Sequence, residues 1–356
     1  MNKPIFSRED FTLCDVPVPV GYPQSQTHSG IAMYKGNYYL TTSPYPNKKY
    51  STVVSYIRSI LKKITGGVLC NPINGEVYEN PCIYIGDNKD EIPIKFKPLT
   101  VKPLMETPEA VFGFPAYNSD PDIFIENDIV YILNRVYYRT SNKQGGITDV
   151  FLIKGSVKYE KFKLESLQLI KEWERLFVSP CLINYRGKYV FTYLHSKSAL
   201  DAKTFDGLYL QEVESIDKLS NNDNERKILI HDCELLPWHM SLFSHKEVLY
   251  TIITCVNKGD ITKKTWQMLG EFNQDLTELT IYPTPLTDYN SYRSSALVRE
   301  DGLFVLYNTV VWEHIKGTNS VDGRDVVMAK CVFEDFLNKL RDKYTLILKK
   351  DNARTE

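Results

Sequence analysis

The stretch HSGIAMYKGNYYL, residues 28–40, consists of a polar start, an apolar run, a turn at Lys35-Gly36-Asn37 and a second apolar run. The same order of residues recurs four more times, as DPDIFIENDIVYIL (120–133), SPCLINYRGKYVF (179–191), HMSLFSHKEVLYT (239–251) and SSALVREDGLFVLY (294–307). Two short apolar runs on either side of a tight turn are typical of a β-hairpin. Each of the five copies therefore predicts one pair of antiparallel strands.

The spacing of the copies indicates how the hairpins are arranged. Successive copies lie 92, 59, 60 and 55 residues apart when these apolar residues are taken as equivalent: Ile31, Ile123, Leu182, Leu242 and Leu297. Repeats of this length are typical of propellers and other arrays. Further strand-like segments follow several hairpins and bring each unit to about four strands, the usual size of a propeller blade. We therefore predict an all-β, five-bladed β-propeller, and an up-and-down barrel is a weaker alternative because it would not repeat at this length.

The division of the chain follows from the same repeat. We expect residues 1–333 to form a single propeller, with an insertion at about 48–105 between the first and second blades, and residues 334–356 to form a C-terminal extension. Within the insertion, residues 51–63 (STVVSYIRSILKK) have apolar side chains at helical spacing, which predicts an amphipathic helix. That helix could pack on a blade edge, cover one face or contact a partner.

Composition excludes several classes of function. The chain has 43% hydrophobic residues, 24% charged residues and a net charge of −1, with acidic and basic residues mixed along its length. A nucleic-acid-binding protein would show a basic stripe, so neither nucleic acid nor a membrane surface is an expected partner. No apolar run approaches the roughly 18 residues of a membrane span, and the first residues, MNKPIFSREDFTL, lack the apolar core of a signal peptide. We expect synthesis in the cytoplasm without a signal peptide.

The repeat also predicts where a ligand would bind. The inner strands of a propeller surround a central channel, so residues just ahead of each apolar run should meet at one end of it. In this chain those positions are polar or aromatic, and we select as candidate site residues His28, Asn118, Asp120, Asp122, Ser179, Trp238, His239 and Arg293, with Tyr45 at the rim. Hydrogen-bonding groups beside aromatic rings are typical of a ligand site. The mixture suits a carbohydrate, which offers hydroxyls and ring faces.

The repeated phrases resemble those of the five-bladed glycoside hydrolases of families 43, 32, 62 and 68. HSGIAMYKGNYYL is similar to their first-blade phrase, PDIFIENDIVYI to their second-blade Pro-Asp-Ile phrase and SPCLINYRGKYVF to their third-blade phrase. A second resemblance rests on the phrases THSGIAMYKGNYYLTTSPYP, YENPCIYIGDN, YNSDPDIFI, VSPCLINYRGKY, PWHMSLF and YRSSALV in that order. This set looks like a group of uncharacterised propellers often encoded among bacteriophage structural genes. It implies incorporation in a virion and contacts with other virion proteins.

The resemblance to glycoside hydrolases implies three catalytic carboxylates, because such enzymes transfer protons on both faces of the sugar. Asp122 matches the carboxylate that sets the pKa of the acid. His28, however, stands where the first-blade aspartate is expected, and Val178 stands where the third-blade glutamate is expected. Asp120 is two residues from Asp122, and two such side chains should point to the same side of a strand, so they would not flank a bond. We therefore predict glycan recognition without conventional catalysis.

Other interpretations stay open at this point. In a rearranged hydrolase Asp122 would act with His28 or His239, and in a purely structural assembly protein the channel would have no ligand. Arg293 could pair with Asp122 or Asp120 and hold neighbouring blades together, Asp120 could build a turn, and His239 could be a core imidazole. His28, Asp120, Asp122 and His239 could hold a divalent ion, but no sequence spacing supports this, and we expect neither a metal nor another cofactor.

Overall fold

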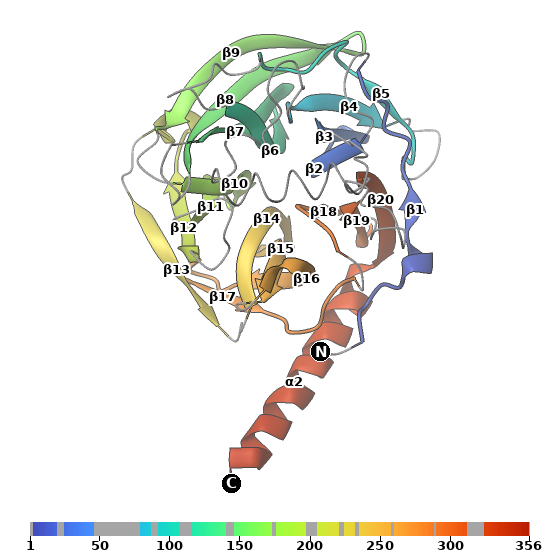
Figure 1. Cartoon of the computed structure of the whole chain (residues 1–356), viewed down its shortest axis with the longest axis vertical. Coiled ribbons are helices and arrows are strands. Elements are labelled where there is room, and N and C mark those ends of the chain that lie inside the picture. Colours follow the sequence, from blue (N-terminus) through green and yellow to red (C-terminus); the bar gives the residue numbers. More distant parts are fainter. Residues whose placement is uncertain are drawn as a thin grey trace, which may run out of the picture.

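The computed structural model describes residues 3–19, 25–45, 79–86, 92–106, 116–139, 146–172, 176–196, 205–220, 224–231, 235–257, 260–287, 290–311 and 324–355. Strands dominate these residues and lie in sheets arranged around a common centre (Figure 1). One long helix, α2 (Phe333–Thr355), projects away from the sheets. The predicted all-β propeller is confirmed.

The strands form antiparallel meanders, each of which begins near the centre and proceeds outwards (Figure 1). The first meander contains β2 (Ser25–Tyr34), β3 (Asn37–Tyr45), β4 (Cys82–Gly86) and β5 (Phe96–Pro98). The second contains β6 (Ala116–Glu126), β7 (Ile129–Arg139), β8 (Gly146–Lys158) and β9 (Lys161–Lys171). The third contains β10 (Leu176–Tyr185), β11 (Lys188–Ser196), β12 (Phe205–Val213) and β13 (Glu225–His231). The fourth contains β14 (Leu235–His245), β15 (Val248–Asn257), β16 (Asp260–Phe272) and β17 (Glu278–Ile281).

The last sheet joins the two ends of the chain. It contains β18 (Ser295–Val298), β19 (Leu303–Val311) and β20 (Arg324–Val332), and the N-terminal strand β1 (Thr12–Leu13) pairs with β20 at its outer edge. Two short 3₁₀ helices, η1 (Arg8–Asp10) and η4 (Ile216–Lys218), complete the described elements. The innermost strands are neighbours in the order β2, β6, β10, β14, β18 and back to β2, so the ring is closed.

The strand pairing bears on two predictions, the number of blades and the insertion at about 48–105. Because β13 also pairs with β17, the third and fourth meanders form one eight-stranded sheet. The described strands therefore fall into four sheets, and the blade count of five stays a prediction. β4 and β5 lie inside the range 48–105 assigned to an insertion, yet they pair with β3 as part of the first sheet. The helix expected at 51–63 lies outside the described residues.

The hairpin turns explain why each repeated phrase folds as it does. Consecutive residues have positive φ at four of the turns, for example Lys35-Gly36 and Arg186-Gly187. Positive φ at both central residues gives a turn whose twist matches that of the flanking strands. In the fifth hairpin Gly302 has a φ of +82°. The inner strand pairs predicted from the sequence are thus present with their turns in the predicted places.

The hydrophobic core lies between neighbouring meanders. Tyr38 and Leu40 of the first meander, for example, share one buried cluster with Val305 and Tyr307 of the last sheet. Similar clusters lie at the other boundaries between neighbouring meanders. Burial of apolar surface on both sides of each sheet is the main force that closes the ring.

Helix α2 starts inside the core. Phe333, Phe336, Leu337 and Leu340 are buried in the cluster that the fourth meander shares with the last sheet. The exposed fraction of Leu346 is 58%, so burial is confined to the first turns of the helix among the residues whose side chains are described. No helix in the described part of the chain combines the length and apolar character needed to cross a membrane.

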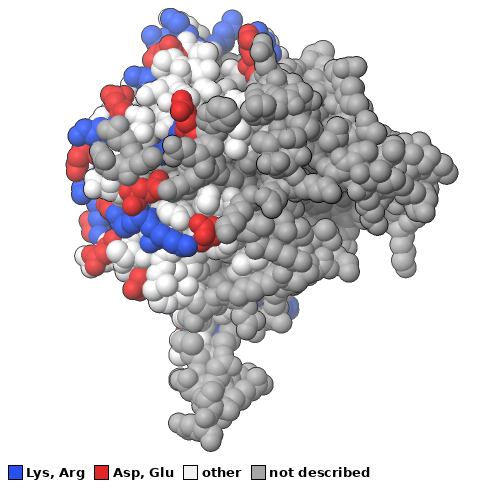
Figure 2. All heavy atoms as spheres, turned by 60° about the vertical axis from the view of Figure 1, so that its left-hand side comes forward, with Lys and Arg blue, Asp and Glu red and all other residues white. Residues whose placement is uncertain are grey.

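Charges of both signs are mixed on the described part of the surface shown in Figure 2. Lys and Arg side chains alternate with Asp and Glu side chains over the described residues of the face in Figure 2. This pattern agrees with the net charge of −1. It gives no support to a basic nucleic-acid-binding surface on this face.

The docking of α2 can be tested at Phe333, which is fully buried and contacts the rings of Phe243, Tyr250 and Phe304. Truncation of a buried phenylalanine leaves a cavity, so we expect Phe333→Ala to lower the free energy of unfolding by about 3–5 kcal/mol. Leu346→Ala, at an exposed position of the same helix, should change it by less than about 0.5 kcal/mol. Urea unfolding followed by circular dichroism measures both. Equal effects of the two substitutions would contradict a helix anchored in the core.

Candidate functional site

The inner strands are bulged where the sequence places the candidate site. In β2, β6 and β10 the register shifts at the residues between Thr27 and Gly30, Ser119 and Asp122, and Val178 and Cys181. In β14 the extra residue is Trp238. A β-bulge inserts an unpaired residue and re-aims its side chain. The bulges therefore turn selected side chains away from the regular pattern of their sheets.

Within the described strands, the non-glycine residues with positive φ lie at the same positions. His28, Asp120 and Ser179 have φ values of 55°, 52° and 49°. These residues occupy equivalent places in three successive repeats, each three residues ahead of the equivalent apolar residue. A non-glycine residue in the left-handed region costs of order 1–3 kcal/mol and is found mostly where function requires it.

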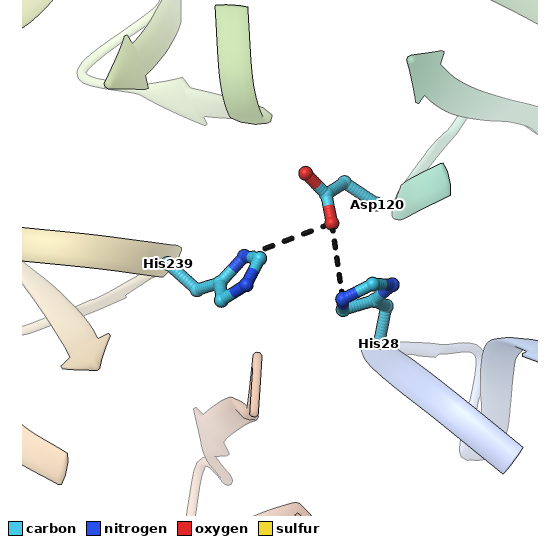
Figure 3. A group of neighbouring side chains, drawn as sticks. All are labelled: His28, Asp120 and His239. Atoms are coloured by element: carbon cyan, nitrogen blue, oxygen red, sulfur yellow. Dashed lines mark ion pairs between the residues drawn. The ribbon is translucent and has the colours of Figure 1, made fainter. Parts of the chain in front are cut away.

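Asp120 lies at the centre of the cluster that results (Figure 3). Its Oδ1 is 3.3 Å from His28 Nε2 and 3.6 Å from His239 Nδ1. Its Oδ2 accepts a hydrogen bond from the backbone N–H of Ser179, at 3.0 Å, and lies 3.2 Å from Arg135 Nε. Burial alone would raise the pKa of Asp120, but Arg135 and the two histidines hold it below its usual value. Asp120 is therefore a buried carboxylate that stays ionised.

Glu79 and Ser119 surround the far side of the His28 ring. His28 Nδ1 is 2.9 Å from Glu79 Oε2, and the Ser119 hydroxyl donates to the same oxygen at 2.7 Å. Arg135 in turn donates from Nη2 to Ser119 Oγ at 3.1 Å. The imidazole is thus held in one orientation by a carboxylate behind it, and its Nε2 faces Asp120.

His239 approaches Asp120 from the opposite side. Its Nδ1 is 2.9 Å from the Ser179 hydroxyl, and burial holds the pKa of its imidazole well below the usual value. Both the Ser179 hydroxyl and the Asp120 carboxylate face Nδ1, so His239 cannot relay a proton from one to the other through its two nitrogens. The arrangement is therefore not a Ser-His-Asp triad.

Aromatic rings line the same place. The ring of Tyr292 lies 6.0 Å from that of His28 and 5.9 Å from that of His239, and the Trp238 ring lies 5.8 Å from His239 in an edge-to-face arrangement. Tyr292 and Trp238 are partly exposed, whereas the two histidines and Asp120 are buried. The polar cluster thus has aromatic neighbours on its more accessible side.

Asp122 takes part in a different interaction. Its Oδ1 is 2.5 Å from Arg293 Nη2, and its Oδ2 accepts from the backbone N–H of Leu182 at 3.0 Å. Burial alone would lower the pKa of Arg293, but the Asp122 carboxylate raises it above its usual value. The pair is therefore ionic and buried, as in the structural alternative given above for Arg293.

Arg293 binds more than Asp122. It donates from Nε to the carbonyl of Met240 at 2.9 Å, and from Nη1 to the carbonyl of Pro121. Its Nη2 also lies 3.4 Å from Cys181 Sγ. One guanidinium therefore joins β6, β10 and β14 from a position just ahead of β18.

The expectation that Asp120 and Asp122 point to the same side of one strand rests on a premise that β6 does not meet. That expectation assumes regular alternation, and the bulge at Asp120-Pro121 breaks it. Asp120 faces the histidines and Arg135, whereas Asp122 faces Arg293 and Leu182. The two carboxylates consequently have separate partners.

The candidate residues divide into groups. His28, Asp120, Ser179 and His239 meet in one cluster, with Trp238 beside it. Asp122 and Arg293 form the neighbouring pair. Asn118 is buried and exchanges hydrogen bonds with the Glu106 carbonyl and the Asn134 amide. Tyr45 ends β3, and its side chain lies outside the described residues. The functional roles assigned to these residues stay predictions.

Glu79 and Arg135 are not among the residues that the sequence predicts for the site. Glu79 lies outside the repeated phrases, so no pattern marks it. Arg135 is a charged residue inside the apolar strand β7, and that break in the apolar run is the signal that could have identified it. Tyr292 precedes Arg293 directly and shares its position ahead of the fifth apolar run.

Three of the candidate site residues could hold a metal ion. The side chains of His28, Asp120 and His239 each offer one ligand atom, and these atoms all lie within 4.8 Å of one another. Two imidazoles and a carboxylate are ligands that first-row divalent ions accept.

Solved structures of carbohydrate-active proteins share this fold. An N-acetylgalactosamine deacetylase from F. plautii, in complex with blood group B trisaccharide, superposes with a TM-score of 0.55 at 12% identity, covering 90% of this chain and 94% of its own. A family 117 glycoside hydrolase from Zobellia galactanivorans gives 0.55 at 11% identity, with 90% and 89% covered. A Bombyx mori family GH32 β-fructofuranosidase gives 0.56 at 12%, with 90% and 61% covered.

At these identities the likeness shows the fold alone, and that fold is the β-propeller found in glycoside hydrolases. No family model and no curated sequence matches the chain. The comparisons give no support to the likeness with phage-associated propellers, which stays a prediction.

The Arg293–Asp122 pair makes a direct stability prediction. Arg293→Met leaves a carboxylate buried without its partner, so we expect the free energy of unfolding to fall by about 3–5 kcal/mol. The double variant Arg293→Met/Asp122→Leu removes both charges and should recover most of that loss. Lys35→Met, which breaks an exposed pair with Asp128, should change the free energy of unfolding little, because solvent screens such a pair. Urea unfolding of the four proteins compares them, and a double variant no more stable than Arg293→Met would contradict the pairing.

Proposed function

We propose that this protein binds a carbohydrate at the axial cluster of His28, Asp120 and His239, with Trp238 and Tyr292 contacting the sugar. One observation carries the proposal: two imidazoles and a carboxylate from three different sheets meet beside two aromatic rings. Hydrogen-bonding groups that converge next to aromatic faces are what a sugar requires. The fold shared with carbohydrate-active propellers supports the same class of ligand.

The contacts favour recognition of a carbohydrate without conventional cleavage of a glycosidic bond. Glycoside hydrolysis needs an acid and a second carboxylate on opposite sides of the bond. Asp122 is engaged by Arg293, and Asp120 is engaged by Arg135 and the Ser179 amide. Glu79, the third carboxylate at the site, pairs with His28. Incorporation in a virion, expected from the sequence, stays a prediction and is not part of the proposal.

A panel of glycans tests the proposal. We expect saturable binding of at least one glycan without release of reducing ends, and Trp238→Ala and His239→Ala should each weaken that binding by about tenfold or more, because each removes a contact worth roughly 1.4 kcal/mol or more. His231→Ala is the matched control, since His231 forms an exposed pair with Glu278 on an outer strand. Calorimetry or a glycan array measures binding, and circular dichroism verifies the fold.

Two results would overturn the proposal. Release of reducing ends that Asp122→Asn abolishes would establish the rearranged hydrolase instead. No binding to any member of a broad panel by the folded protein would favour a structural assembly role.

A further inference from the structure

Three donor atoms from distant parts of the chain point at one another in the centre of the propeller (Figure 3). They are His28 Nε2 on β2, Asp120 Oδ1 on β6 and His239 Nδ1 on β14. The carboxylate oxygen is 3.3 Å from one nitrogen and 3.6 Å from the other. Around a tetrahedral ion with bonds of about 2.0–2.1 Å, neighbouring ligand atoms lie about 3.3 Å apart. The distances from Asp120 Oδ1 to the two histidine nitrogens are therefore close to the separation that a tetrahedral ion requires between its ligand atoms.

The hydrogen bonds behind His28 prepare its Nε2 for a cation. Nδ1 is 2.9 Å from Glu79 Oε2, so this nitrogen carries the ring proton and donates a hydrogen bond to the carboxylate. Nε2 is buried and has no hydrogen-bond partner among the described residues, although it lies 3.3 Å from Asp120 Oδ1. A histidine whose other nitrogen donates to a carboxylate is the usual arrangement at a metal ligand, because the carboxylate fixes the ring and raises its basicity.

Asp120 Oδ1 and His239 Nδ1 supply the other two donor atoms. Asp120 Oδ2 is held by the Ser179 N–H and lies against Arg135, which leaves Oδ1 directed at the two rings. At His239 the Ser179 hydroxyl lies 2.9 Å from Nδ1. With the ring proton on Nε2, the single lone pair of Nδ1 accepts either this hydroxyl or a cation, so an ion bound at Nδ1 displaces the hydroxyl from it. Three electron-rich atoms then face one point, and a cation at that point removes their mutual repulsion.

The charge of the surroundings is consistent with a divalent ion. Asp120 and Glu79 supply two negative charges to the cluster, and Arg135 supplies one positive charge. Asp122 and Arg293 form a separate pair of opposite charges. When both histidines are neutral, as metal-binding histidines are, the cluster has a deficit of positive charge within a buried region, where an uncompensated charge is costly.

We propose that His28 Nε2, Asp120 Oδ1 and His239 Nδ1 bind one divalent ion of the zinc class. The mixed nitrogen and oxygen ligands favour such an ion over Ca²⁺ or Mg²⁺, which prefer oxygen ligands. Three protein ligands leave a position for a further oxygen. This inference rests on the proposed function to the extent that the ion supplies the polar anchor for a sugar hydroxyl at that open position.

Metal binding is tested on the full chain after treatment with a chelator and its removal. We expect about one equivalent of Zn²⁺ by calorimetry and elemental analysis, and Co²⁺ in its place should give the visible absorption of a four- or five-coordinate site. Asp120→Asn and His239→Ala should abolish both signals. Glu79→Gln should weaken Zn²⁺ binding by about 10–100-fold, because it removes only the carboxylate behind His28.

The matched control is His195→Ala, since His195 pairs with Asp206 outside the cluster. It removes a histidine beside a carboxylate and should leave Zn²⁺ affinity unchanged. Circular dichroism establishes that each variant is folded. Absence of Zn²⁺ and Co²⁺ binding by the folded wild-type protein would overturn the proposal, as would equal Zn²⁺ affinity in wild type, Asp120→Asn and His239→Ala.

Glycan binding with and without Zn²⁺ separates this inference from the proposed function. If the ion anchors a sugar hydroxyl, chelation should weaken glycan binding by about tenfold or more, a loss of roughly 1.4 kcal/mol or more. Zn²⁺ binding by a protein that binds no glycan would support the metal site and contradict the proposed function. Glycan binding by a protein that binds no Zn²⁺ would support the proposed function and contradict the metal site.

Discussion

The buried guanidinium of Arg293 is the interaction on which the centre of this propeller depends. It binds Asp122 and the Pro121 carbonyl of β6, the Met240 carbonyl of β14 and the thiol of Cys181 on β10. Removing such a charge from water costs several kcal/mol, and the cost is offset only if most of its donors are satisfied. These partners lie on β6, β10 and β14, the inner strands of three successive meanders. The positions of β6, β10 and β14 are therefore coupled through one side chain, in addition to the apolar contacts between the sheets.

This constraint also places the candidate site. The Pro121 carbonyl that Arg293 binds belongs to the residue between Asp120 and Asp122, so the bulged segment of β6 is held at both the carbonyl and the second carboxylate. Gly30 contributes from β2, because a Cβ atom there would lie 2.6 Å from Thr41 Oγ1 and 3.1 Å from the Pro121 carbonyl oxygen. The absence of a side chain allows β2 and β6 to approach closely, and that approach brings His28 to Asp120. Two aspartates in one short motif thus serve different purposes, one in holding the sheets and one in the polar cluster.

The sequence predicts the fold and the location of the site better than it predicts the partners within the site. Turn residues and alternating apolar residues are local signals, so the hairpins around Gly36 and Gly187 follow directly from them. The equivalence of the repeats places His28, Asp120, Ser179 and His239 at one end of the channel. The bulges are not visible in the pattern, because a single inserted residue changes which side chains share a face. Glu79 and Arg135 reach the cluster only through tertiary packing, which neither spacing nor composition encodes.

The backbone strain inside the strands, as distinct from that in the turns, favours a functional origin for the cluster over a packing origin. Three non-glycine residues in the left-handed region, at about 1–3 kcal/mol each, together cost an amount comparable to a sizeable part of the stability of an ordinary domain. Packing alone would be satisfied by glycine at those places, since glycine adopts positive φ without steric cost. The chain has instead His28, Asp120 and Ser179, whose side chains all contact the same small polar centre. The strained residues are the ones whose side chains meet, and the apolar clusters between the sheets offset the cost of the strain. The presence of polar residues instead of glycine at these places is therefore explained by the contacts that their side chains make with one another and by what they bind together.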